Sequence, residues 1–171
     1  MDFLKFFSNE PEVEIKKYSS LFSVLQNEYP QMNEEGILIT SCVAGLLARV
    51  AYVDFHLDVK EQEVMKDLLG QFHFIANIDP CIVAQIAIKH IKEMAGLENH
   101  LYVHPLKNLL SKDERYNIIQ SLFLIAASDG SVEVVESEEI RLITKGFELS
   151  NQHFLAARAE VAKFLKSLRK N

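Results

Sequence analysis

Hydrophobic residues recur at three- and four-residue spacing along nearly the whole chain, and no segment shows sustained alternation with period two. This spacing places apolar side chains on one face of an α-helix. It predicts a first helix over residues 12–29, which Pro30 ends, and a last helix over residues 151–169. We therefore expect an all-α fold, a compact bundle of about seven to eight helices.

Polar residues mark where the helices between these two begin. The signals are Asn33, the capping-box sequences Asp58–Glu61 and Ser111–Glu114, and the pair Asp79-Pro80. In the helix after Asp79-Pro80, the pattern predicts that isoleucines face the core, namely Ile82, Ile86, Ile88 and Ile91. Residues 97–110 are the least regular and contain Pro105, so they predict a loop with one short helix.

The segment from Gly36 to Val53 is almost continuously apolar and is about as long as the shortest membrane-spanning helix. It also contains Thr40, Ser41 and Arg49, and an arginine is costly inside a bilayer. We therefore expect a buried central helix here. The N-terminal sequence lacks the cationic start and long apolar core of a signal peptide.

The chain has 171 residues, which suits a single domain over residues 1–171. Its formal net charge of −6 argues against a nucleic-acid-binding protein, whose binding face is normally basic. Two cysteines, Cys42 and Cys81, lie far apart without a CxxC motif, so we expect two buried thiols in a cytoplasmic protein.

An internal repeat is the most informative feature of the sequence. The segment 47–61 aligns without a gap on the segment 122–136, and repeat units extend over about 33–75 and 111–150. Asp54 falls on Asp129, and Glu61 falls on Glu136. Each unit predicts a buried helix, an acidic corner and an amphipathic helix. Two units packed together would bury each other's apolar faces.

The acidic corners allow two interpretations. Gly130 permits the left-handed turn that ends a helix, and Glu136 would meet the free amides of the next helix, so capping alone explains the pattern. The carboxylates also offer oxygen ligands of the kind that hard divalent cations take. The spacing matches the second half of an EF-hand loop, but Ile125 and Ala127 occupy the first ligand positions, which excludes an ordinary EF-hand.

The segment Ala126-Ala-Ser-Asp129-Gly-Ser-Val-Glu-Val-Val-Glu136, with its degenerate first copy, resembles the tellurite-resistance TerB family. It is also similar to the N-terminal region of the membrane-anchored J-domain co-chaperone DjlA. The resemblance covers roughly residues 20–165. It implies an all-helical bacterial domain with a pseudo-twofold repeat, linked to stress responses and to protein complexes at the inner membrane face, and no defined enzymatic reaction.

The resemblance further implies a divalent-cation site, of the calcium or magnesium class, at the acidic residues. The candidate ligands are Asp54, Asp58, Glu61, Asp129, Glu133 and Glu136, of which Asp58 and Glu133 match only as neighbouring acids. Phe55 replaces the glycine of the second copy, and a bulky residue disfavours a positive φ, so we expect the first corner to be built differently.

Three functions stay open at this stage. The first is a non-enzymatic stress-response interaction module that binds a divalent cation at its corners. The second is a co-chaperone-type adaptor whose acidic patch binds a partner protein without metal. A second copy of the chain, forming a homodimer, is a further candidate partner. The third, a cation-dependent hydrolase, lacks an identifiable nucleophile or base. The last helix is basic, through Arg158, Lys163, Lys166, Arg169 and Lys170. These cations suit a helix C-terminus, and they would also suit a surface that binds anionic lipid or an acidic partner.

Overall fold

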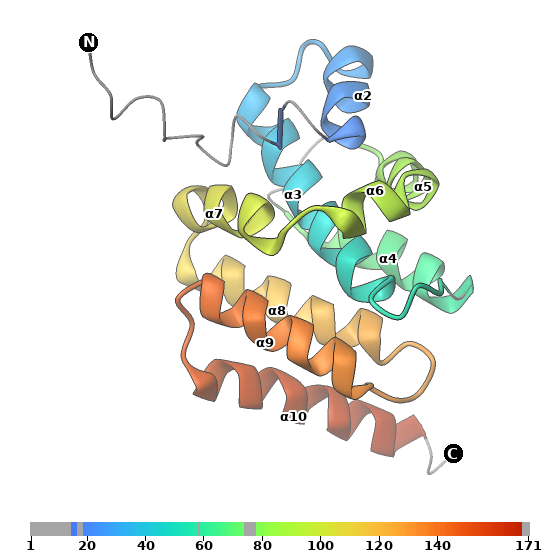
Figure 1. The fold of residues 1–171 in the computed structure, drawn as a ribbon, viewed down its shortest axis with the longest axis vertical. Coiled ribbons are helices and arrows are strands. Elements are labelled where there is room, and N and C mark those ends of the chain that lie inside the picture. The colour runs from blue at the N-terminus through green and yellow to red at the C-terminus, as the bar shows by residue number, and fades with distance from the viewer. Residues whose placement is uncertain (1–14, 17–18, 58, 74–77, 169–171) are drawn as a thin grey trace.

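The computed structural model describes residues 15–16, 19–57, 59–73 and 78–168, and it describes side chains as far as Ala162. These residues form helices and no strand, which confirms the all-α fold class (Figure 1). The helices are α2 (Ser20–Glu28), α3 (Glu34–Ala51), α4 (Val59–Gln71), α5 (Pro80–Lys89), α6 (Ile91–Gly96), α7 (Asn99–Leu109), α8 (Lys112–Ala126), α9 (Val134–Gly146) and α10 (Asn151–Leu168).

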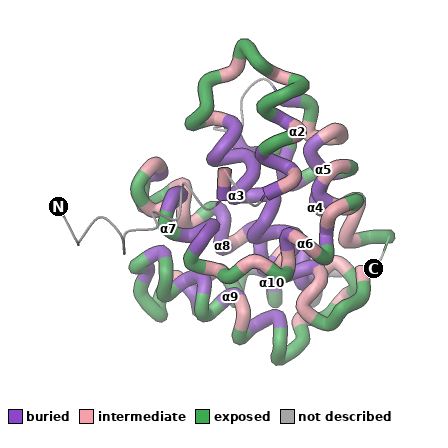
Figure 2. Tube along the Cα trace, turned by 45° about the horizontal axis from the view of Figure 1, so that its top comes forward, coloured by how far each residue is buried: buried purple, intermediate pink, exposed green. Residues whose placement is uncertain are grey.

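Helix α3 is the centre of the bundle, as expected for the apolar segment. Fourteen of its 18 residues are buried, and it packs against α2, α5, α6, α7 and α8 (Figure 2). Helices α8, α9 and α10 pack against one another on one side of it (Figure 1). A helix that is apolar all round is stable in water only when neighbours cover every face. In the described part of the chain no helix has the length and apolar character needed to cross a membrane.

Three of the helix starts are capped as the sequence predicts. Asn33 Oδ1 accepts from the N–H of Gly36 at 2.7 Å, and Asp79 Oδ1 accepts from the N–H of Cys81 at 2.9 Å. Ser111 forms a full capping box, because Ser111 N–H donates to Glu114 Oε2 at 2.7 Å and Glu114 N–H donates to Ser111 Oγ at 3.3 Å. The fourth predicted cap, Asp58, lies outside the described residues.

Two helix boundaries differ from the prediction. The continuous helix over residues 12–29 is wrong, because Ser19 is extended (φ −83°, ψ 113°) and caps α2 by accepting from the N–H of Phe22. The loop predicted for residues 97–110 is also wrong, because α7 runs through Pro105. Proline removes one helical hydrogen bond, but the turns around it are buried in the core, and this packing outweighs the lost bond.

The predicted core face of α5 is confirmed in part, because Ile86 and Ile88 pack against the core although neither is fully buried. Its fully buried residues are Val83, Ala84 and Ala87, whereas the isoleucines at 82, 86 and 88 are half-buried and only Ile91, the first residue of α6, is buried as expected. The helix ends at Lys89, so the spacing from Ile82 to Ile91 does not continue on one helix face. Cys42 is buried as expected, but Cys81 is only half-buried because it lies in the first turn of α5.

The helix ends around the two corners recur with the offset found in the sequence. Helix α3 ends at residue 51 and α8 at residue 126, while α4 spans 59–71 and α9 spans 134–146. Each pair of bounds differs by the same offset as Asp54 and Asp129. The local succession of buried helix, corner and amphipathic helix is therefore the same in both segments. The pseudo-twofold arrangement of the complete units stays a prediction.

Candidate functional site at two acidic corners

The second corner joins α8 to α9 and is closed by Asp129. Its Oδ1 atom accepts from the N–H of Ser131 at 2.9 Å, a turn in which an aspartate bonds the backbone two residues on. Gly130 has φ 106°, the left-handed conformation that favours glycine. The half-buried Val132 packs against the core. The prediction that Gly130 forms the left-handed turn at the end of this helix is confirmed.

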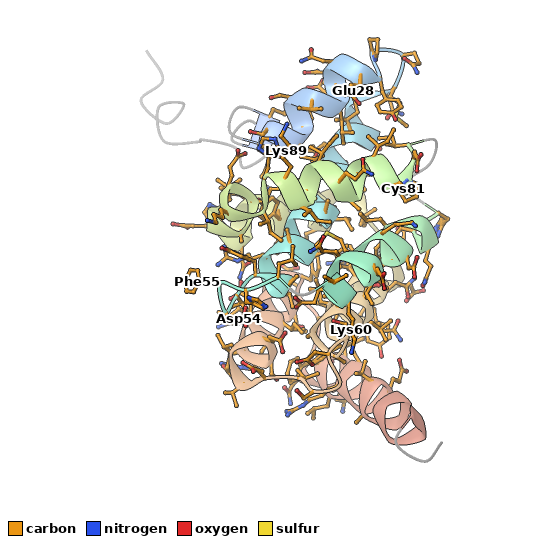
Figure 3. The ribbon with its side chains drawn as sticks, turned by 90° about the vertical axis from the view of Figure 1, so that its right-hand side faces the viewer. Glu28, Asp54, Phe55, Lys60, Cys81 and Lys89 are labelled. Carbon is orange, nitrogen blue, oxygen red and sulfur yellow. The ribbon has the colours of Figure 1, made fainter. Side chains whose placement is uncertain are left out.

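The first corner joins α3 to α4 and has the same local geometry. Asp54 Oδ1 accepts from the N–H of His56 at 2.8 Å, and Phe55 has φ 66°. Figure 3 shows the Asp54 and Phe55 side chains at this corner. The expectation that Phe55 would force a different turn is therefore wrong. The bond from His56 to Asp54 and the bond from Phe55 N–H to Tyr52 O, at 3.0 Å, hold the turn despite the bulky residue. The Phe55 ring meets the Tyr52 ring edge to face at 6.2 Å and is otherwise 82% exposed.

Glu136 is the most unusual side chain of the site. It lies in the first turn of α9, is only 8% exposed, and its Oε2 accepts from the N–H of Glu133 at 2.7 Å. Burial raises the pKa of Glu136 to about 7. The bond from Glu133 N–H opposes that rise, and the charges of Glu61, Asp129 and Glu133 add to it. Glu136 therefore titrates near neutral pH, under the influence of three other carboxylates.

The two corners adjoin one another. The charge of Glu61, from the start of α4, acts on Glu136 in α9. Lys60 and Val64 of α4 line the same hollow of about 490 Å³ as Asp129 and Gly130. Sequence offset alone could not decide whether the corners meet, because that depends on how α4 and α8 pack. Their contact brings the start of α4 to the second corner.

Arginines neutralise two of the five acids between Asp129 and Glu139. Glu138 pairs with Arg141 on the exposed side of α9, at 2.5 Å. Glu139 pairs with the Nε of Arg49, whose Nη1 also donates to the backbone carbonyls of Ala95, at 2.8 Å, and Leu97. Arg49 thus ties α3 to α9 and to the segment between α6 and α7. The sequence marked Arg49 only as a charged residue in an apolar helix and did not predict these partners.

The candidate ligands do not form a ready-made metal site. Among the residues that the structure describes, no group of three or more His, Cys, Asp or Glu side chains is placed to hold a metal ion. Asp58 lies outside these residues. The oxygen donors suit a hard cation by their chemistry, but Asp129 and Glu136 each already use one oxygen in a backbone hydrogen bond.

The sequence analysis did not predict a contact between a serine hydroxyl and a histidine ring, which are residue types found in catalytic sites. Ser150 Oγ lies 2.6 Å from His153 Nδ1, and Ser150 N–H also donates to that nitrogen at 3.2 Å. Both residues sit at the start of α10, and the His153 ring packs on Tyr116. Since the ring nitrogen accepts from the backbone, as the acidic partner of a capping box does, the pair caps the helix.

These observations describe an all-helical domain with two adjoining acidic corners. A family model described as "Tellurite resistance protein TerB" matches residues 40–159, a range that includes both corners. The chain therefore belongs to the TerB family and contains a tellurite-resistance-like domain. No curated protein and no solved structure matches the chain.

Proposed function

We propose that this protein is a non-enzymatic binding module of a tellurite-resistance-like stress response and that it binds through its acidic corners. The observation that carries the proposal is the position of Glu136, whose carboxyl is buried next to Glu61, Asp129 and Glu133. Like charges held together repel one another, so a positively charged ligand is favoured there. Membership of the TerB family supports the same role.

A divalent cation of the calcium or magnesium class is the first candidate ligand. The candidate donors are all carboxylate oxygens, apart from the backbone, and these are the ligands such ions take. Because fewer than three described carboxylates can reach one ion, water and backbone carbonyls would complete its shell. A site of this kind would be weak, with a Kd of roughly 10⁻⁴–10⁻³ M.

Calorimetric titration of the full chain with calcium, magnesium, manganese and zinc tests this proposal. A cation requires the ionised carboxylate, and burial raises the pKa of Glu136 to about 7, so binding near neutral pH is coupled to proton release from Glu136. Titrations in two buffers of different ionisation enthalpy measure that proton. Glu136→Gln keeps the acceptor for Glu133 N–H and abolishes the proton release. Asp129→Ala/Glu136→Ala abolishes binding, whereas the exposed control Glu138→Ala leaves it unchanged. Binding that survives the double substitution would contradict the cation proposal.

A partner protein is the second candidate ligand. The exposed Val134 and Val135 stand directly beside the acids, which suits a protein interface better than a cation site. In this version the module is a co-chaperone-type adaptor, and its partner belongs to a stress complex at the cytoplasmic face of the inner membrane. Complex formation would then persist in excess EDTA and be lost in Asp129→Ala/Glu136→Ala. Loss of the complex in EDTA alone would favour the cation.

A further inference from the structure

Large apolar side chains gather in solvent at the two corners. Six large hydrophobic residues are exposed in the described part of the chain, and four of them lie there: Phe55 at 82%, Val59 at 67%, Val134 at 82% and Val135 at 43%. Val59 and Val134 are the first residues of α4 and α9 and occupy equivalent positions in the two repeat units. Clustered apolar side chains with a polar rim mark interaction sites more often than scattered ones do.

These four side chains lie near two hollows at the corners, of which Phe55 lines one and Lys60, the neighbour of Val59, lines the other. Phe55 and Tyr52 line a hollow of about 490 Å³ together with Glu139, which lies one helical turn after Val135 on the same face of α9. On the other side, the hollow between Lys60 and Asp129 joins the start of α4 to the second corner. We call this the corner surface: Phe55, Val59, Val134 and Val135 with the acids Asp54, Glu61, Asp129 and Glu133.

The charge of the corner surface is negative. Glu136 adds a fifth carboxyl beneath its four acids. The cations near it are Lys60 at the start of α4 and Lys92 in the Phe55 hollow, while Arg49 is already paired with Glu139. An anionic membrane or a nucleic acid would be repelled by this excess. A segment that carries lysine and arginine would be attracted.

Phe55 has a strained backbone conformation, and burial of its side chain does not offset the strain. A non-glycine residue with a positive φ costs on the order of 1 kcal/mol, and burial of the side chain is one way to offset that cost. The Phe55 ring is 82% exposed and contacts the Tyr52 ring. Aromatic side chains presented in this way are frequent anchors of protein interfaces.

We propose that the corner surface docks a basic amphipathic helix of a partner protein. The apolar face of that helix covers Phe55, Val59 and Val134, and its lysine or arginine side chains pair with Asp54, Asp129 and Glu133. This mode is known as helix-in-groove recognition, with anchors every three or four residues. The inference rests on the proposed binding role of the corners and specifies the chemistry of the partner.

A fluorescent leucine–lysine peptide of amphipathic helical design is the probe, and a peptide of the same composition in scrambled order is its control. Anisotropy titrations with the full chain measure both. We expect the amphipathic peptide to bind roughly tenfold more tightly than the scrambled one, since only the former presents anchors on one face. Phe55→Ser/Val134→Ser weakens binding roughly tenfold. Leu155→Ser, which replaces an exposed leucine on α10, leaves it within about twofold.

Two results of the peptide titrations would overturn the inference. One is equal binding of the amphipathic and scrambled peptides, and the other is unchanged binding by the folded Phe55→Ser/Val134→Ser variant, whose circular dichroism and urea midpoint establish that it is folded. A concentration-dependent dimer that the same variant abolishes, seen by sedimentation, would instead assign the surface to a second copy of this chain. Cation calorimetry separates the two proposals, because the serine substitutions leave every carboxylate in place. Peptide binding that fails while cation binding persists overturns only the partner inference.

Discussion

Phe55 and Gly130 occupy equivalent positions at the two corners and share a left-handed backbone conformation, with φ of 66° and 106°. Each follows an aspartate that accepts a hydrogen bond from the N–H two residues on. Glycine adopts this conformation without steric cost, whereas phenylalanine does not. The same turn is therefore stable at one corner and strained at the other, and substitutions at the two positions have opposite effects.

At the corners, we expect Phe55→Gly to be more stable than Phe55→Ala by roughly 1 kcal/mol, because both remove the ring and only glycine relieves the positive φ. Gly130→Ala should lower the free energy of unfolding by about 1 kcal/mol. A Cβ at Gly130 meets no atom within 4 Å, so this loss is one of backbone conformation alone. Urea denaturation measures all three variants. A Phe55→Ala variant as stable as Phe55→Gly would contradict the strain at Phe55.

At Arg49, we expect Arg49→Lys to lower the free energy of unfolding by about 2–3 kcal/mol. A lysine has no planar fork with which to bond Glu139 and the carbonyls of Ala95 and Leu97 together. A double-mutant cycle of Arg49→Met with Glu139→Gln isolates the ion pair, because both substitutions remove a charge, and we expect a coupling of about 1 kcal/mol. If the two single substitutions lower the free energy of unfolding by amounts that add up to the loss in the double variant, the ion pair contributes no coupling energy.

In the core, Gly45→Ala should destabilise the protein by about 1–3 kcal/mol, as overpacking does. A Cβ at Gly45 would lie 2.2 Å from the ring of Tyr102, which is fully buried and donates to Met94 O at 2.6 Å. The ring therefore has no room to move aside. Gly96→Ala is the matched control, because a Cβ there meets nothing within 4 Å, and it should cause no loss. Thermal unfolding of both variants checks this, and equal midpoints would contradict the close packing.

Much of the fold follows from local signals in the sequence. Helical spacing and the caps at Asn33, Asp79 and Ser111 predict most helix starts, since a cap depends on residues only a few positions apart. The bounds of α4 and α9 differ by the offset at which the two sequence segments align. The burial of α3 follows from its composition alone. These features need no knowledge of long-range contacts.

The errors lie where tertiary packing overrides a local preference. Pro105 favours a loop in isolation, yet the core around α7 keeps it helical. Phe55 disfavours a positive φ, yet the hydrogen bonds of its corner impose one. The approach of Glu61 to Glu136 and the partners of Arg49 depend on which helices pack together. Cation binding, partners and the role of Asp58 stay predictions.

Glu136 should make stability depend on pH in a window set by its pKa. Between the ordinary value of 4.5 and about 7, the folded protein binds more protons at Glu136 than the unfolded chain does. The free energy of unfolding therefore falls as pH rises through this window. Glu136→Gln removes that slope and should be more stable than the original protein at pH 8, by about 1–2 kcal/mol after allowance for solvent screening.

Urea denaturation at pH 5, 6, 7 and 8 measures this dependence. Glu138→Gln is the control, because the hydrogen bond from Arg141 lowers the pKa of Glu138 and moves its titration below the window. Its slope between pH 5 and 7 should equal that of the original protein. A Glu136→Gln variant that keeps the full slope would show that Glu136 does not titrate there.

Amide chemical-shift mapping of the full ¹⁵N-labelled chain measures binding at the acidic corners residue by residue. One sample is titrated with calcium or magnesium, and a second with the amphipathic leucine–lysine peptide. We expect the perturbed amides to cluster at residues 54–61 and 129–136 in at least one titration, and the amides of α7 and α10 to stay unchanged. Perturbations confined to other helices, or none with either ligand at millimolar concentration, would contradict binding at the acidic corners.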